Sequence, residues 1–236
     1  MIEIIPAIMP DSYDDLSEKA GRVHGIVPIA QIDIMDGVFV ASKSWPYRRG
    51  GIGADEDFLK LSNQDEGLPH WEELDYEIDL MILEPEKHID EWLPLGASRL
   101  IFHIESIKDM DAFFGNDIFK EGARDIGGQK VIEVGLAINP DTSLEAITPY
   151  ISQVDFVQCM GITKIGYQGQ PFDERVLAHI NQLRVMHPNL IISVDGGVNF
   201  DTAPLLRAAG ANRLVSGGVV FGSEDIRETI KALKNT

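Results

Sequence analysis

Acidic side chains stand at the ends of three apolar runs in this chain. Asp33 follows Gln31 and Ile32, Asp79 lies in Ile78-Asp79-Leu80-Met81, and Asp195 follows Ile191-Ile192-Ser193-Val194. A strand alternates its faces, so Gln31, Asp33 and Met35 point the same way. Three carboxylates that converge without a cation repel one another until at least one holds a proton. The three acids therefore predict one shared, electrostatically unusual site.

Single residues of these types usually have structural roles, and several here are interpreted in that way. Asp36, just before Gly37, is expected to accept loop hydrogen bonds. His103 is the one histidine at a predicted strand end, and we interpret it as a hydrogen-bonded structural residue. Cys159 lies within an apolar strand and is expected to be a buried, inert thiol. Asp33 and Asp195 differ because each ends an apolar strand, where its carboxylate faces the active end of the fold.

Eight apolar runs of strand length alternate with amphipathic segments, which is typical of βα units around a parallel sheet. The predicted strands are Glu3 to Ile8, Ala30 to Met35, Glu77 to Ile82, Arg99 to His103, Val131 to Ile138, Phe156 to Met160, Leu190 to Val194 and Arg213 to Ser216. The predicted helices are Asp14 to Val23, Asp55 to Leu61, Glu86 to Leu93, Ile107 to Phe114, Leu144 to Ile151, Asp173 to Met186, Asp201 to Ala209 and Glu224 to Leu233. Eight units indicate an α/β fold, a single (β/α)8 TIM barrel over residues 1–236, with its active site at the carboxyl ends of the strands.

The connection between the second and third predicted strands is longer than a barrel needs. It covers residues 41–71 and includes the polar run 46–53. A loop of this length is either functional or a solvated insertion. The sequence leaves both a lid and an insertion open.

Glycine-rich segments follow the sixth, seventh and eighth predicted strands. Glycine lets backbone N–H groups approach an oxyanion closely, and phosphate sites in these barrels often use the loops after strands seven and eight. We therefore predict a phosphate site here. The segments are Gly166 to Gln170, Gly196-Gly197 and Ser216-Gly217-Gly218.

The bulk composition argues against some classes of partner and indicates a cellular compartment. The net charge of -18, from 20 basic and 38 acidic residues, argues against nucleic acid and anionic membranes as partners. One cysteine excludes an internal disulfide and favours the cytoplasm. The N-terminal residues lack the pattern of a signal peptide, and no apolar stretch approaches 18 residues, so neither export nor membrane insertion is expected.

Ordered motifs along nearly the whole chain resemble the ribulose-phosphate 3-epimerase family. The motifs are Ile5-Pro6-Ala7-Ile8, Asp33-Ile34-Met35-Asp36-Gly37-Val38-Phe39-Val40, Asp79-Leu80-Met81 with Pro85-Glu86, Val134-Gly135-Leu136-Ala137-Ile138-Asn139-Pro140, Gly166-Tyr167-Gln168-Gly169-Gln170-Pro171-Phe172, Val194-Asp195-Gly196-Gly197-Val198-Asn199 and Val215-Ser216-Gly217. The resemblance implies interconversion of ribulose 5-phosphate and xylulose 5-phosphate through an enediolate. Asp33 and Asp195 would move the proton, and a divalent metal (Mg, Mn, Zn or Fe) would stabilise the negative charge.

By the same resemblance, the metal would be held by Gln31, Asp33, Asp79 and Asp195. The phosphorylated ketose would contact a larger set, namely Ala7, Met35, Met81, Gly166, Gly169, Gln170, Gly196, Gly197, Ser216, Gly217 and Gly218.

The chain departs from the family pattern at four places. Gln31 and Asp79 stand where the family has two metal-binding histidines, and Ala7 replaces a serine. The segment after the sixth strand, residues 160–165, lacks the family's Asn/Asp-Pro-Gly. The ligand set thus has a formal charge of -3 instead of -2, and its oxygen atoms suit Mg²⁺ or Mn²⁺ better than Zn²⁺.

These departures keep two other interpretations open. One is an isomerase or lyase acting on another phosphosugar, and the other is a phosphosugar-binding paralogue with impaired catalysis. The sequence also leaves open an assembly of identical chains.

Overall fold

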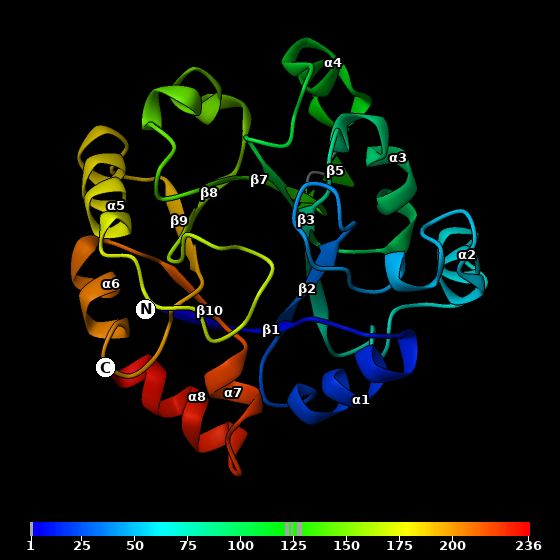
Figure 1. Cartoon of the computed structure of the whole chain (residues 1–236), viewed down its shortest axis with the longest axis horizontal. Coiled ribbons are helices and arrows are strands. Elements are labelled where there is room, and N and C mark those ends of the chain that lie inside the picture. Colours follow the sequence, from blue (N-terminus) through cyan, green and yellow to red (C-terminus); the bar gives the residue numbers. More distant parts are fainter. Residues whose placement is uncertain (1, 121–122, 124, 127–128) are drawn as a thin grey trace.

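Eight parallel strands close into a barrel in the computed structural model, which describes residues 2–120, 123, 125–126 and 129–236 (Figure 1). Around the barrel the order is β1-β10-β9-β8-β7-β4-β3-β2. The strands are β1 (Glu3–Ile8), β2 (Ile29–Met35), β3 (Asp75–Met81), β4 (Arg99–His103), β7 (Glu133–Ile138), β8 (Phe156–Met160), β9 (Ile191–Asp195) and β10 (Arg213–Ser216). The predicted TIM barrel is confirmed.

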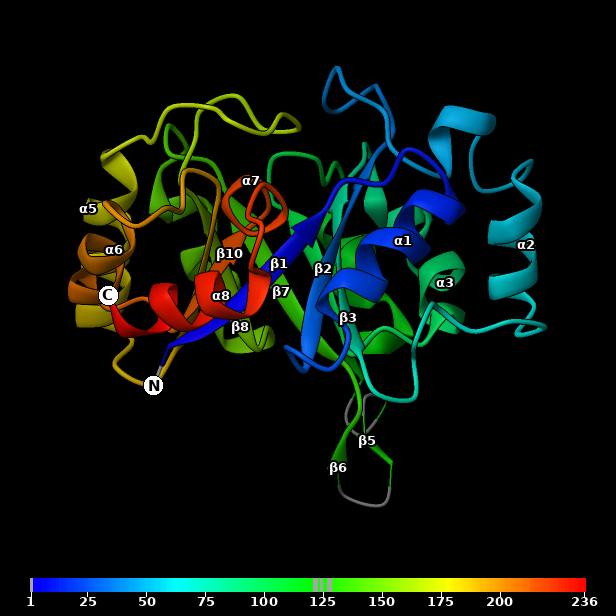
Figure 2. The same ribbon diagram turned by 90° about the horizontal axis from the view of Figure 1, so that it is seen from below.

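A short hairpin that the sequence did not predict precedes β7. Strands β5 (Asp125–Ile126) and β6 (Gln129–Lys130) pair antiparallel. The hairpin lies at the end of the barrel opposite the loops that follow the strands (Figure 2). The fifth barrel strand consequently begins at Glu133 instead of Val131.

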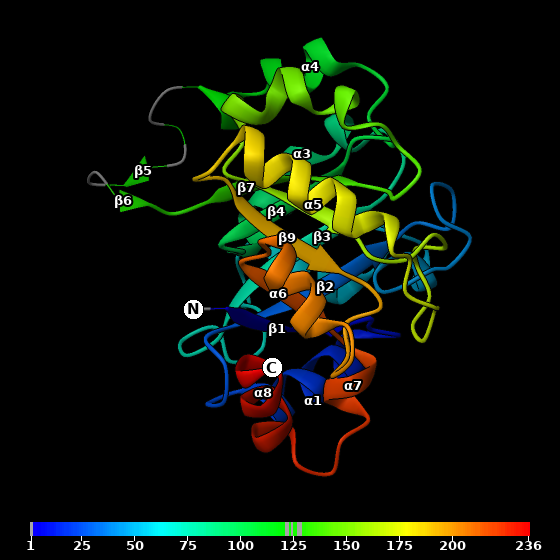
Figure 3. The ribbon, with the colours of Figure 1, turned by 90° about the vertical axis from the view of Figure 1, so that its left-hand side faces the viewer.

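Helices cover the outside of the barrel, with α5 and α6 side by side over the flank formed by β8 and β9 (Figure 3). The helices are α1 (Tyr13–Val23), α2 (Glu56–Ser62), α3 (Ile89–Trp92), α4 (Met110–Gly115), α5 (Arg175–Met186), α6 (Ala203–Ala209), α7 (Gly218–Phe221) and α8 (Ile226–Asn235). Side chains cap several of them, for example Ser12, whose Oγ accepts from the Asp15 N–H at 3.2 Å. In the part of the chain that is described, no helix has the length and apolarity needed to cross a bilayer.

The α-helix predicted over Leu144 to Ile151 is wrong. This crossover consists of two 3₁₀ helices, Leu144–Ala146 and Thr148–Gln153. Pro149 has no N–H to donate to an α-helical partner, and its ring clashes with the preceding turn. The helix predicted over Glu86 to Leu93 is likewise broken, because 3₁₀ turns at Pro85–Lys87 and Leu93–Leu95 flank the four-residue α3.

The long connection over residues 41–71 packs on the barrel and is not simply a solvated insertion. Trp45, Phe58 and Leu68 are buried in the main core. The indole Nε1 of Trp45 donates to Asp55 Oδ1 at 2.9 Å, which ties the segment to the start of α2. Only its first part reaches the open end of the barrel, so a lid role for the segment stays a prediction.

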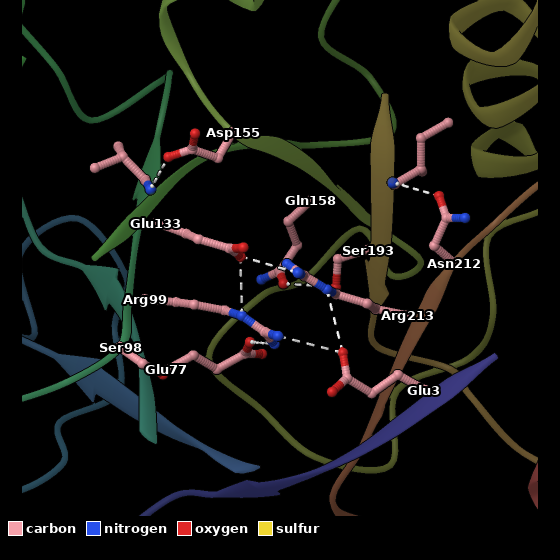
Figure 4. Close-up of polar contacts among 12 residues, drawn as sticks. Glu3, Glu77, Ser98, Arg99, Glu133, Asp155, Gln158, Ser193, Asn212 and Arg213 are labelled. Carbon is pink, nitrogen blue, oxygen red and sulfur yellow. Dashed lines mark hydrogen bonds and ion pairs between the residues drawn. The ribbon is translucent and has the colours of Figure 1, made fainter. Parts of the chain in front are cut away.

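The interior of the barrel is polar at the amino-terminal end of the strands, which we call the lower end. Five charged side chains form an ion cluster there (Figure 4). We call this group the floor cluster: Glu3, Glu77, Arg99, Glu133 and Arg213. Arg99 contacts all three glutamates, at 3.0 Å for the buried Glu77. Arg213 contacts Glu3 at 3.2 Å and Glu133 at 2.9 Å. Barrel interiors of this class are usually filled by branched apolar residues, so the charges here replace part of an apolar core.

We predict that Glu77 makes folding stability depend on pH. Burial raises the pKa of Glu77 to about 7, although Arg99 lowers it. Because the folded pKa lies above the unfolded one, the folded state favours the protonated form, and stability falls as pH rises from about 4.5 toward 7. Relative to the wild type, Glu77→Gln should gain up to about 3 kcal/mol over this range.

Urea unfolding at pH 4.5, 6 and 7.5 measures this effect, with Glu18→Gln on the exposed side of α1 as the control. A difference between Glu77→Gln and wild type that is constant with pH would contradict it.

Cys159 should resist thiol reagents in the folded protein. The side chain is fully buried in β8, and burial raises the pKa of its thiol to about 12. The thiolate is the reactive form, so the native protein should show no reaction at pH 8. Ellman's reagent should then titrate one thiol per chain only after denaturant is added. Full reaction without unfolding would refute the prediction.

Candidate functional site

A cavity of about 480 Å³ opens at the carboxyl ends of the strands. Asp33 and Asp195 are on its wall together with ten of the eleven predicted substrate-binding residues, namely Ala7, Met81, Gly166, Gly169, Gln170, Gly196, Gly197, Ser216, Gly217 and Gly218. Met35, the eleventh, was expected here but is not on this wall. It is buried below Gly166 and lines a neighbouring hollow of about 370 Å³ instead.

Three carboxylates meet beneath the cavity because of strand register. Asp33 on β2 lies opposite Asp79 on β3, and Asp195 reaches the same place from the end of β9. One oxygen of each lies within 4.8 Å of the others. The sequence prediction that these three acids converge is confirmed as geometry.

The amide of Gln31 joins the two outer acids. Its Nε2 donates to Asp33 Oδ1 at 2.7 Å and to Asp195 Oδ2 at 2.9 Å. Gln31 is fully buried, and its Oε1 has no hydrogen-bond partner among the described residues. The amide nitrogen therefore stands between the carboxylates, and an unused acceptor lies beside it.

Asp79 is held separately, by two side chains, one on the neighbouring strand β4 and one on β8 across the barrel. His103 Nε2 lies 3.0 Å from Asp79 Oδ1, and Gln158 Nε2 donates to Asp79 Oδ2 at 3.2 Å. Ser193 Oγ donates to Gln158 Oε1 at 3.2 Å, which links the set to the barrel interior seen in Figure 4. All four side chains are at most 1% exposed.

Burial and mutual repulsion shift the pKa values of the acids. The pKa of Asp33 is raised well above its ordinary value, first by burial and then by Asp195 and Asp79. The pKa of Asp195 is raised by burial and then by Asp79. Burial lowers the pKa of His103, but the Asp79 carboxylate more than offsets this, and the net shift is upward. The site thus favours shared protons, as the convergence of carboxylates predicted.

Glycine is required where two loops meet at the cavity wall. A Cβ on Gly161 would lie 2.2 Å from the Gly196 carbonyl oxygen, and the Gly161 N–H donates to the Asp195 carbonyl at 2.6 Å. Gly196 and Gly197 both have positive φ, +91° and +69°. These backbones approach one another and the cavity more closely than residues with side chains allow.

Asp36 has the structural role that was expected. Its Oδ1 accepts from the N–H groups of Val38 and Phe39, at 2.7 and 2.9 Å, and its Oδ2 accepts from Leu83 N–H at 2.8 Å. It therefore fixes the loop after β2 against the end of β3.

Sequence reasoning missed the polar partners of the acids. His103 was expected to be hydrogen-bonded, but its partner Asp79 was not foreseen, and Gln158 was not considered. A signal for Gln158 was present: it alternates with Met160 on β8, and Met160 lines the cavity. Further wall residues not predicted are Met9, Ile162, Tyr167, Gln168, Val198, Asn199, Val215 and Val219.

The residues present fit a hard divalent cation. Asp33, Asp79 and Asp195 each place one carboxylate oxygen within 4.8 Å of the other two, which forms an all-oxygen donor set. Gln31 turns Nε2 toward Asp33 and Asp195, so its Oε1 would join this set only with the amide turned over. Such donors suit Mg²⁺ or Mn²⁺. The chemistry of the donors therefore agrees with a metal at the predicted position.

Comparison with known sequences gives consistent matches along the chain. The sequence model described as "Ribulose-phosphate 3 epimerase family" matches residues 61–221. The chain is 29% identical to ribulose-phosphate 3-epimerase of Bacillus subtilis over the full length of both. It is 32% identical to ribulose-5-phosphate-3-epimerase, chloroplastic, of Arabidopsis thaliana, covering 99% of this chain and 76% of that protein.

Solved structures of low identity share the fold. The 3-keto-L-gulonate-6-phosphate decarboxylase of Vibrio cholerae has a TM-score of 0.65 at 13% identity, over 100% of this chain and 95% of that one. A 3-hexulose-6-phosphate synthase has a TM-score of 0.62 at 20% identity, over 99% and 98% of the two chains. These structural similarities support the barrel fold alone. The sequence matches also identify the family: the chain belongs to the ribulose-phosphate 3-epimerase family.

Proposed function

We propose that this protein is a sugar-phosphate epimerase that interconverts ribulose 5-phosphate and xylulose 5-phosphate. Family membership supports an isomerase of the epimerase type. The substrate and the two-aspartate mechanism are proposed from one observation, the pair Asp33 and Asp195. These two side chains reach one cavity from β2 and β9, and Gln31 bridges them. Epimerisation needs two proton-transfer groups on opposite sides of one carbon, and two separately mounted carboxylates meet that need.

The reaction removes one proton from the substrate and adds another proton to the same carbon. One carboxylate removes the proton at C3, next to the C2 carbonyl, and the electron pair of the C–H bond moves into the enediolate. The other acid, protonated beforehand, delivers its proton to the opposite face of C3. The reverse reaction exchanges the roles of Asp33 and Asp195, so each acid is base in one direction and acid in the other.

A divalent cation would be held by Asp33, Asp79 and Asp195, and Gln31 would add Oε1 as a fourth donor when its amide is turned over. When bound, it would supply Lewis-acid stabilisation of the enediolate oxygens. Asp79 is not needed as a proton carrier in this scheme, because Asp33 and Asp195 make both proton transfers. Its two oxygens instead contact His103 and Gln158.

The loops after β8, β9 and β10 would bind the phosphate of the ketose. Their glycines lie on the cavity wall beside Ser216, and no lysine or arginine is among the described residues of that wall. In a chain of net charge -18, backbone N–H groups are then the main donors available to the anion at this wall.

Proton exchange at C3 in D₂O tests the proposal. Ribulose 5-phosphate should take up deuterium at C3 and appear as xylulose 5-phosphate when the protein is supplied with Mg²⁺, Mn²⁺, Zn²⁺ or Fe²⁺, followed by NMR. A parallel panel of hexulose phosphates identifies the alternative substrate class. Tight binding of pentulose phosphate without exchange, in folded protein with every metal, would favour a binding protein and refute the epimerase.

A further inference from the structure

We infer that His103 is a positioning residue for this site. Its hydrogen bond holds Asp79 in place as a cation ligand, at the position where the family has a histidine. The inference rests on the proposed metal chemistry of the family site. It goes beyond that chemistry because it assigns a positioning role to His103, which the proposed proton transfers do not use.

The first support is the hydrogen bond itself. His103 Nε2 lies 3.0 Å from Asp79 Oδ1, and both side chains are 0% exposed. An ionised Asp79 can only accept, so Nε2 then carries the proton in this contact, whether the imidazole is neutral or charged. The contact therefore constrains Asp79 in either state of the ring.

The second support is strand geometry. Asp79 lies opposite Ile101 in the pairing of β3 with β4, and His103 comes two residues later on the same face of β4. The imidazole therefore reaches back along the barrel to Asp79. The Phe39 ring lies 5.5 Å from the imidazole, centroid to centroid. Packing and burial together leave His103 little freedom to turn away.

The third support is that Asp79 has a different set of partners from the other two acids. Gln31 bridges Asp33 and Asp195, whereas Asp79 is held by His103 on one oxygen and by Gln158 on the other. Asp79 is thus oriented independently of the Gln31 amide. At metal sites, hydrogen bonds to a ligating carboxylate fix its orientation. Loss of such a hydrogen bond typically lowers metal affinity or activity by about 10- to 100-fold.

Binding of Mn²⁺ alone, measured by calorimetry, tests the inference. His103→Leu removes the donor at similar volume and should weaken Mn²⁺ binding by about 10- to 100-fold. His103→Gln keeps a donor and should lose less. In the Asp79→Asn background, His103→Leu should have almost no further effect, because a residue that acts through Asp79 has nothing left to position.

Two results would overturn the inference: wild-type Mn²⁺ affinity in a folded His103→Leu variant, or losses from Asp79→Asn and His103→Leu that simply multiply. If His103→Leu does not fold, His103→Met, which also lacks an N–H donor, takes its place, and unchanged Mn²⁺ affinity in that folded variant overturns the inference equally. A wild-type protein that epimerises without binding Mn²⁺ would remove this inference and leave the two-aspartate function. A protein that does neither would remove both.

Discussion

Asp33→Asn and Asp195→Asn should each lower kcat for epimerisation by about 10²- to 10⁴-fold, the usual contribution of a positioned general acid or base. Asparagine keeps the shape of the side chain, and its oxygen can still accept from Gln31 Nε2, so the fold should be retained. What is lost is the capacity to take or give a proton at C3. Steady-state rates in both directions, with circular dichroism as a check on folding, measure the effect.

The two variants should also differ from each other in D₂O. With one acid removed, the remaining one can still abstract and return the proton of the epimer that it faces. Each variant should therefore exchange C3–H of one epimer without converting it, and the two variants should select opposite epimers. Asp65→Asn, at an exposed position in the 41–71 segment, is the control and should behave as wild type. Loss of exchange from both epimers in one variant only would indicate a single proton carrier and exclude the two-aspartate mechanism.

Gly161→Ala should damage stability and catalysis together. The new Cβ would lie 2.2 Å from the carbonyl oxygen of Gly196, a backbone atom that cannot rotate away. We expect a loss of about 1 to 3 kcal/mol or more in the free energy of unfolding, as for other overpacked sites. The displaced loop carries Asp195, and a shift of about 1 Å at a reacting group can cost about 10²-fold in rate.

Gly53→Ala is the matched control, because a Cβ there meets none of the described atoms within 4 Å and its backbone is not left-handed. It should leave both the unfolding free energy and kcat/KM unchanged. If Gly161→Ala were as stable and as active as Gly53→Ala, the close approach of residues 161 and 196 would be irrelevant to the site.

The barrel was predictable because its signals are local and repeated. Eight apolar runs with helical segments between them leave few other arrangements, and the family motifs fix which strand ends carry Asp33 and Asp195. The crossover at 144–153 was mispredicted because an amphipathic segment that follows polar cap residues predicts an α-helix, whereas the missing N–H of Pro149 decides the local geometry.

The partners of the site residues were harder to predict, since they depend on register. Nothing in the sequence near His103 shows that it faces Asp79 across β3 and β4, or that Gln158 completes the set from β8. Met35 was misplaced for a related reason. Alternation gives the face of the strand correctly, but not the depth at which the side chain meets the loop at Gly166.

The floor cluster has a consequence for isotope experiments. Salt bridges among Glu3, Glu77, Arg99, Glu133 and Arg213 cross the lower end of the barrel. We expect water to reach the reacting carbon mainly through the open end, where the substrate itself enters. While substrate fills that entrance, a tritium atom removed from C3 should stay on its carboxylate longer than an exposed carboxyl group would keep it. Partial return of the label to C3 of the starting epimer, before that carboxylate exchanges with water, is therefore the expected signature of a barrel closed at its lower end.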